Sequence, residues 1–292
     1  MSERLVVLNV NYSNHDPNEG EIPSRESAIL EFIKSQRKTD DEPGETTVVL
    51  IDTVWNERFG QDNPETGENK SLADHLGMRA AFHTRIDDQE LNQKGWKKGI
   101  GITVATDHNV EESHIVRLGE KGSTRNALIV DLALAHTVSL AAIYLPETDS
   151  HAQMQQISDL DTELNGPHII PKPSGYKIVA GDFNSLDKHE NYDSFLSKTG
   201  SNLVRLGAKR IQRADEKSYW DKTLLTLDRR LIIPRMKHFG YHDANAGPTY
   251  PSRMPMLDPD HVFSFGINKE AVRTDGKGLS DHRAIVFDFT LR

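Results

Sequence analysis

The sequence predicts a protein of the α/β (α+β) class in which packed β-sheets are covered by helices. Three observations support this prediction. Short apolar runs rich in β-branched residues recur along the chain, helical periodicity appears between some of them, and a tight turn separates one neighbouring pair. Because the expected strands and helices do not alternate strictly, the pattern favours packed sheets over a barrel or a doubly wound fold.

Eight runs have the length and composition of strands. They cover residues 5–10, 47–54, 99–105, 127–134, 138–145, 176–180, 261–265 and 284–289. Several are apolar at consecutive positions, which indicates burial on both faces. The fourth and fifth runs are separated by Ala135, His136 and Thr137, so we expect a hairpin and at least one antiparallel pair.

Two segments have helical periodicity. Ser24 is a candidate N-cap for a helix that carries Ile29, Phe32 and Ile33 on one face. Residues 151–164 form the second candidate helix. The apolar face of this helix consists of Met154, Ile157, Leu160 and Leu164.

The chain has 292 residues, which is long enough to bury a substantial core. Segments 57–70 and 167–175 are rich in Gly, Pro, Asn and acidic residues, so we predict long loops there. Neither segment is typical of an interdomain linker. We therefore expect one domain over residues 1–292, and a monomer.

The composition excludes several kinds of site and partner. The chain has no cysteine, so it has no disulfide or thiolate site, and any metal must bind oxygen or imidazole ligands. The apolar stretch at residues 5–8 is too short for a signal sequence or a membrane span, so we expect a cytoplasmic location, with a secreted protein that has lost its signal as the alternative. The sequence has no amphipathic membrane helix or hydrophobic anchor, so we expect no membrane association. The net charge of -9 argues against non-specific coating of nucleic acid.

One segment departs from this acidic average. Residues 205–238 contain ten Lys or Arg residues and four acidic residues. A solvated helix face and a surface that faces phosphate are equally compatible with such a run.

The most informative segment is residues 176–184, a predicted buried strand that ends in Gly181, Asp182, Phe183 and Asn184. Because strand residues two apart point to the same side, Asp182 and Asn184 are expected to converge on one site. An aspartate there can take a proton from water, and an asparagine can donate hydrogen bonds to a phosphoryl oxygen. In isolation, such a pair is more typical of a turn.

Acids and an imidazole precede the last two predicted strands. Asp281 and His282 come just before the final strand, and Asp260 introduces the strand before it. Asp281 can bind a hard cation, His282 can donate a proton or hydrogen bond to a phosphate oxygen, and Asp260 can accept the imidazole N–H. The remaining histidines have no shared ligand spacing and are expected at the surface or in the core with their hydrogen bonds satisfied; they include His75, His83, His108, His114 and His136.

The order of these segments along the chain resembles the endonuclease/exonuclease/phosphatase superfamily, whose members include deoxyribonuclease I. A first strand ends in Asn9, Val10 and Asn11, and a later one ends in Tyr144, Leu145 and Pro146. The Gly-Asp-Phe-Asn, Asp-His-Val-Phe and Ser-Asp-His segments follow in the family's order. The resemblance covers roughly residues 5 to 290, and it implies a four-layer α/β sandwich of two packed mixed β-sheets flanked by helices.

The resemblance also implies roles for individual residues. Asn9, Asn11 and Asp281 correspond to positions at or beside the metal, which is Mg2+ or Mn2+. Tyr144 and Asn184 resemble the residues that contact the substrate phosphate. Asp182 would align or deprotonate the attacking water. Asp260 and His282 resemble the family's Asp–His pair, which stabilises charge on the phosphate.

One position departs from the family pattern. The family's metal-binding glutamate at the end of the second strand falls on Thr53, whose neutral hydroxyl is a weaker ligand for Mg2+. Asp52 could replace this glutamate if a β-bulge turned its side chain inward, because neighbouring strand residues otherwise face opposite sides. Glu57, in the loop that follows, could also reach back.

Together these features lead us to expect a divalent-metal-dependent phosphodiesterase, most simply a nuclease, with nucleic acid as substrate. The basic stretch 205–238, including Arg229 and Arg230, would help to hold the nucleic-acid backbone. A phosphatase or phospholipid-type phosphodiesterase of the same fold is one alternative. A metal-deficient family member that acts as a binding protein is the other, and Thr53 is its direct support.

Overall fold

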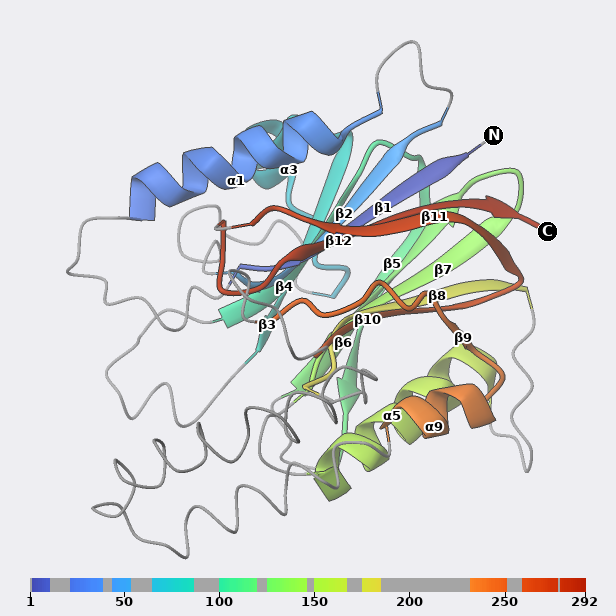
Figure 1. The fold of residues 1–292 in the computed structure, drawn as a ribbon. Helices are drawn as coiled ribbons and strands as arrows, with labels where there is room; N and C mark the ends of the chain where they lie inside the picture. The colour runs from blue at the N-terminus through green and yellow to red at the C-terminus, as the bar shows by residue number, and fades with distance from the viewer. Residues whose placement is uncertain are drawn as a thin grey trace, which may run out of the picture.

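A computed structural model describes residues 2–10, 22–38, 44–53, 65–86, 100–119, 125–145, 150–166, 175–184, 232–250, 259–277 and 279–292 (Figure 1). The described strands form two six-stranded sheets. Each sheet is mixed, since β1 pairs in parallel with β2 and β7 pairs in parallel with β8, whereas the other strand pairs are antiparallel.

The first sheet, sheet A, has the strand order β11-β12-β1-β2-β4-β3. Its strands are β1 (Glu3–Asn9), β2 (Thr46–Thr53), β3 (Ala80–Ile86), β4 (Ile100–Thr106), β11 (Ile267–Asp275) and β12 (Ala284–Leu291). Sheet B has the order β5-β6-β7-β8-β10-β9. Its strands are β5 (Val110–Leu118), β6 (Arg125–Ala133), β7 (Thr137–Tyr144), β8 (Tyr176–Asp182), β9 (His242–Asp243) and β10 (Asp260–Phe265).

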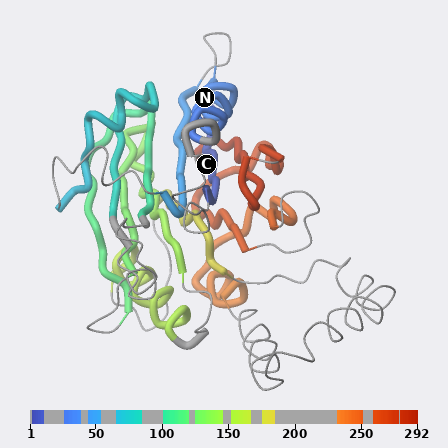
Figure 2. Tube along the Cα trace, turned by 90° about the vertical axis from the view of Figure 1, so that its left-hand side faces the viewer, coloured from blue at the N-terminus to red at the C-terminus, as the bar shows by residue number. Residues whose placement is uncertain are grey.

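Helices cover the outer face of each sheet, which gives four layers (Figures 1 and 2). Helices α1 (Ile22–Gln36) and α3 (Lys70–Leu76) cover sheet A, and α5 (Ser150–Asn165) and α9 (Ile232–His238) cover sheet B. Three apolar clusters hold the layers together, one between the sheets and one under each helical layer. The expected sandwich of two mixed sheets flanked by helices is therefore confirmed.

The core between the sheets determines where the functional side chains lie. Alternate residues of β1, β7, β8 and β10 face this core, including Val7, Ala142, Ala180 and Val262. The same alternation brings Asn9, Tyr144, Asp182 and Asp260 to that side at the strand ends. Both chain termini lie at the opposite end of sheet A, because Glu3 pairs with Phe289.

All eight strands expected from the sequence are present, and the hairpin lies between β6 and β7. The four strands that the sequence analysis missed, β3, β5, β9 and β11, are the edge strands of the two sheets. Edge strands tolerate polar side chains and therefore lack a strong apolar pattern. Most residues of β11, for example, are exposed or half-buried.

The helix over residues 151–164 is confirmed as α5, and Ile157 and Leu160 are buried against sheet B. The cap assigned to Ser24 is wrong, because α1 begins at Ile22 and Ser24 lies within its first turn. Pro23 is compatible with this earlier start, since the first turn leaves its N–H groups without helical partners. Among the described residues, no helix is long and apolar enough to cross a membrane.

Candidate active site

Strand β8 ends at Asp182, which lies at one end of the core between the sheets, where β8 runs close to β7. Gly181, with φ of 147°, permits this, because a Cβ atom there would lie 2.0 Å from the carbonyl oxygen of Ile143 on β7. The Asp182 side chain is buried, and its two oxygens have different donors. The Asn9 side-chain amide donates to Oδ2 at 2.8 Å, and the backbone N–H of Asn184 donates to Oδ1 at 2.7 Å.

Asn184 lies beside Asp182, but for a different reason from the one expected. The strand ends at Asp182, and Asn184 adopts a left-handed conformation with φ of 46°. The two residues are therefore joined by a turn in which the aspartate caps a backbone N–H, and not by strand alternation. The Asn184 side-chain amide donates to the carbonyl oxygen of Leu145 at 2.8 Å, which ties the end of β7 to this turn.

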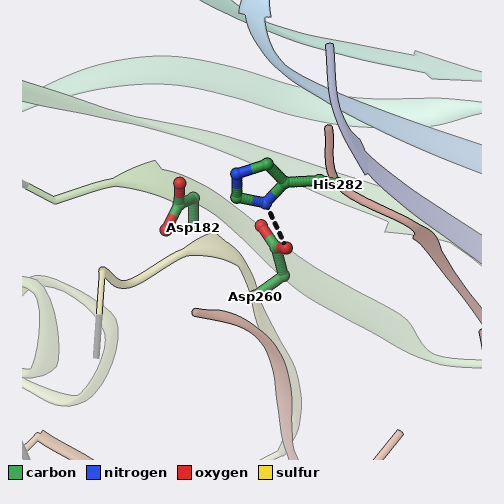
Figure 3. A group of neighbouring side chains, drawn as sticks. All are labelled: Asp182, Asp260 and His282. Carbon is green, nitrogen blue, oxygen red and sulfur yellow. Dashed lines mark hydrogen bonds and ion pairs between the residues drawn. The ribbon is translucent and has the colours of Figure 1, made fainter. Parts of the chain in front are cut away.

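Asp260 and His282 form a buried pair next to Asp182 (Figure 3). Asp260 is the register partner of Asp182 on the antiparallel strand β10. Nδ1 of His282 lies 2.7 Å from Oδ2 of Asp260, and the Thr249 hydroxyl donates to the same oxygen at 2.5 Å. Three segments far apart in the sequence therefore meet at one point.

The pair changes the proton affinity of the site. Burial raises the pKa of Asp182 to about 7, and the charge of Asp260 adds to this effect. Burial alone would lower the pKa of His282, but the neighbouring carboxylates, with Asp260 first, outweigh it and raise the pKa to about 10. At neutral pH His282 is therefore an imidazolium, whereas Asp182 is close to the midpoint of its titration.

The charge of this group would favour a hard divalent cation bound beside it. The ligand atoms of Asp182, Asp260 and His282 all lie within 4.8 Å of one another. Oδ1 of Asp260 is buried and receives no hydrogen bond within the described part of the chain. Since the hydrogen-bond donors to Asp182 are neutral, two buried carboxylates share one positively charged partner, and a cation would balance the remaining charge.

Strand β2 contains a β-bulge at Asp52, the feature that would allow Asp52 to replace the glutamate expected at position 53. The register with β4 shifts between Ile51 and Thr53, and Asp52 has φ of 56° and is buried. The Thr53 hydroxyl lies 3.2 Å from Oγ1 of Thr103, whose neighbours Ile102 and Val104 face the core between the sheets. Thr53 is thus turned toward the helix-covered face, and Asp52 is the residue at the bulge.

The bulge adjoins an unexpected polar group. Nδ1 of His83 lies 2.8 Å from the Thr103 hydroxyl, and its buried Nε2 has no hydrogen-bond partner among the described residues. Burial lowers the pKa of His83 to about 3. We expected the hydrogen bonds of His83 to be satisfied in the core. This holds for Nδ1 but not for Nε2.

The other predicted site residues fall into two groups. Tyr144 is the register partner of Asp182 on β7, and the Arg125 guanidinium lies over its ring at 4.9 Å. Asp281 accepts a hydrogen bond from the Ser280 hydroxyl at 3.1 Å, directly before His282. The second group lies outside the described residues and consists of Asn11, Glu57, Arg229 and Arg230.

Sequence reasoning missed three residues that contact the predicted ones. Arg125 stacks on Tyr144, Thr249 donates to Asp260, and the Tyr250 ring packs at 4.9 Å from the His282 ring. Arg125 begins β6, two residues before the strand expected over 127–134, and this proximity to a predicted strand was a usable signal. Thr249 and Tyr250 follow Gly247 and Pro248 in a segment with no regular pattern, so their place beside His282 depends on the fold.

The sequence matches no protein-family model and no curated protein. Solved structures resemble the whole chain. An endonuclease/exonuclease/phosphatase from Beutenbergia cavernae has a TM-score of 0.60 at 15% identity, and the alignment covers 99% of this chain and 72% of that one. The human Nocturnin catalytic domain with a bound sulfate anion has a TM-score of 0.59 at 14% identity, covering 100% and 95%.

A third structure, TDP2 from D. rerio complexed with a single-strand DNA product, has a TM-score of 0.54 at 12% identity, and the alignment covers 99% of both chains. These identities are low, yet the aligned regions include nearly every residue of this chain. The chain therefore has the fold of the endonuclease/exonuclease/phosphatase proteins, which is the fold that the order of its sequence segments indicated.

Proposed function

We propose that this chain is a divalent-metal-dependent phosphodiesterase that hydrolyses P–O bonds of nucleic acid. One observation carries the proposal: Asp182, Asp260 and His282 arrive from separate segments and meet within 4.8 Å at one end of the core between the sheets. Asp182 is near the midpoint of its titration and can accept a proton, and the His282 imidazolium, paired with Asp260, can donate one.

Each residue of this group has a role that follows from its contacts. Asp182 as carboxylate orients the attacking water and takes its proton, while the Asn9 amide holds the carboxylate in place. Asp260 holds Nδ1 of His282, which leaves the Nε2 N–H of the imidazolium to donate to a phosphoryl oxygen. Tyr144 directly precedes Leu145, and Asn184 donates to the carbonyl oxygen of Leu145. Both side chains would contact the same phosphate.

A bound Mg2+ or Mn2+ would supply positive charge against the phosphate as negative charge develops there. We propose that Asn9, Asp52 and Asp281 hold it. The support for Asp52 is the β2 bulge, which turns Thr53 toward Thr103 and leaves Asp52 as the acid at that strand end. The role normally filled by a glutamate at position 53 would then be filled one residue earlier.

Nucleic acid is favoured as the substrate by two observations. Arg125 and Tyr144 place a cation and a ring beside the strand end that carries Asp182, and both are half-buried. An arginine that stacks on an aromatic ring suits a phosphate next to a base. Two proteins of the same fold have been solved with a sulfate anion and with a single-strand DNA product, respectively.

The test is a substrate panel with controlled metal. The full chain is incubated with single-stranded and plasmid DNA, RNA, a bis-aryl phosphodiester and a phosphomonoester, each with Mg2+, Mn2+ or EDTA. We expect nucleic-acid cleavage that EDTA abolishes. Preference for the phosphomonoester would identify a phosphatase instead, and binding of DNA without turnover would identify the metal-deficient binding protein.

The metal ligands are tested by calorimetric titration with Mn2+, without substrate. Asp52→Asn should weaken Mn2+ binding at least ~10-fold because it removes a carboxylate ligand. Thr53→Val, the matched control, should leave the binding constant unchanged, because the Thr53 hydroxyl is turned to Thr103. The reverse result would return the ligand role to position 53.

A further inference from the structure

We propose that Thr249 is a positioning residue of this site, which acts through Asp260 to fix the orientation of His282. The inference rests on the proposed function for its catalytic consequence. Its structural part, the orientation of the imidazole, stands independently. Thr249 does not belong to any segment that pointed to the site in the sequence.

Thr249 contacts the Asp260–His282 pair from two directions. Its hydroxyl donates to Oδ2 of Asp260 at 2.5 Å, the same oxygen that lies 2.7 Å from Nδ1 of His282. Its carbonyl oxygen accepts the backbone N–H of Arg283 at 2.8 Å, directly after His282. One fully buried residue therefore holds both the carboxylate and the chain that carries the imidazole.

This arrangement restricts rotation of the Asp260 carboxylate. The terminal torsion of an aspartate is broad, so a carboxylate held by one hydrogen bond can rotate. Oδ1 of Asp260 has no hydrogen-bond donor within the described residues, so that atom does not restrain the rotation. Two donors on Oδ2 keep this oxygen opposite Nδ1 of His282, and the other ring nitrogen stays available for substrate.

Loss of the hydroxyl should therefore affect turnover more than substrate binding. Thr249 is buried and contacts the Asp260 carboxylate, so its effect on the reaction passes through His282. We expect Thr249→Val, which keeps the shape and removes the donor, to lower kcat about 10-fold with KM within about two-fold, as for loss of an orienting hydrogen bond. Thr249→Ser keeps the donor and should retain at least about half of kcat.

A matched control addresses the cost of removing any buried threonine hydroxyl. The Thr47 hydroxyl lies 2.8 Å from that of Thr106, at the far end of sheet A from the site. Thr47→Val should leave kcat unchanged. Wild-type kcat in Thr249→Val, or equal losses in the valine and serine variants at position 249, would overturn the proposal.

A measurement without turnover separates this inference from the proposed function. The Nδ1–H proton of a histidine bonded to a buried carboxylate resonates far downfield in the NMR spectrum and exchanges slowly. In the histidine-labelled chain, this signal should persist in Thr249→Ser and should move upfield or broaden in Thr249→Val. An unchanged signal in the valine variant would overturn the positioning role even if the chain cleaved no substrate.

Discussion

One group of acidic residues and histidine lies at the site, at one end of the core between the sheets, and a second group lies at the far end of sheet A. The electrostatics of the two groups differ. At the site, the pKa of His282 rises to about 10 beside buried carboxylates. At the far end, His108 lies 2.7 Å from Glu45 and 3.6 Å from Glu3, yet burial outweighs both glutamates and lowers its pKa. The buried Glu3 lies 3.6 Å from the His108 ring and Glu45 is 41% exposed, whereas Asp260 is 2% exposed and lies 2.7 Å from Nδ1 of His282.

The two ends also differ in how their acids are paired. The Arg37 guanidinium binds both oxygens of Asp107 at the far end, at 3.1 and 2.7 Å. At the site, the donors to Asp182 are the neutral groups of Asn9 and Asn184. Asp107 at the far end therefore has a charged partner, whereas the hydrogen-bond donors to Asp182 are uncharged, so a cation could balance the charge of this carboxylate. Such uncompensated burial is typical of functional sites.

The largest expected effect is on kcat, which should fall in variants of the site but not in a variant at the far end of sheet A. Asp182→Ala and His282→Ala should each lower kcat at least ~100-fold, since each removes a proton-transfer or charge-stabilising group. His108→Gln at the far end should leave kcat within about two-fold. Steady-state kinetics on the best diester checks this, and near-normal turnover in both alanine variants would remove these residues from the mechanism.

The second prediction concerns stability. The pKa of Asp182 is about 7 in the folded chain against 3.8 for an ordinary aspartate, so its ionisation opposes folding as pH rises between these values. Asp182→Asn should therefore raise the free energy of unfolding by about 4 kcal/mol at pH 8 and by little at pH 4. Urea unfolding in EDTA measures this, and an equal gain at both pH values would contradict the assigned cause.

The third prediction tests the far cluster. Arg37→Met should lower the free energy of unfolding by about 1 to 2 kcal/mol, because Asp107 loses its bidentate partner and the guanidinium loses its bond to the carbonyl of Gly77. Arg79→Met is the control, since the Arg79–Glu45 pair is 3.8 Å apart and exposed. Turnover should be unchanged in both variants, and equal stability losses would show that pairing geometry is irrelevant here.

The smallest effect comes from His83, which has no carboxylate partner among the described residues. The pKa of His83 is about 3 in the folded chain against 6.5 ordinarily, so the unfolded chain binds the extra proton and stability falls as pH drops below 6.5. The free energy of unfolding should fall less between pH 7.5 and pH 5.5 in His83→Phe than in the wild type, by about 1 kcal/mol. An identical pH dependence in wild type and variant, measured by urea unfolding, would place the acid sensitivity elsewhere.

The sequence by itself determined the buried strands and the chemistry at their ends. Strands β1, β7 and β8 are apolar on both faces, a pattern that local composition records, and Asp182, Asp260 and His282 stand at the boundaries of such strands. Burial and strand alternation are local properties, so they predicted the class of fold. Most of the candidate site was predicted from the order of the segments along the chain, through its resemblance to the endonuclease/exonuclease/phosphatase superfamily.

Only the tertiary structure decided the remaining features, because they depend on contacts between distant segments. The bulge at Asp52 arises from the register of β2 with β4, and it turns Thr53 away from the core between the sheets. Thr249 reaches Asp260 from an irregular segment. The pKa of His282 likewise depends on carboxylates that no local pattern brings together, since their effect arises from burial and a few ångströms of separation.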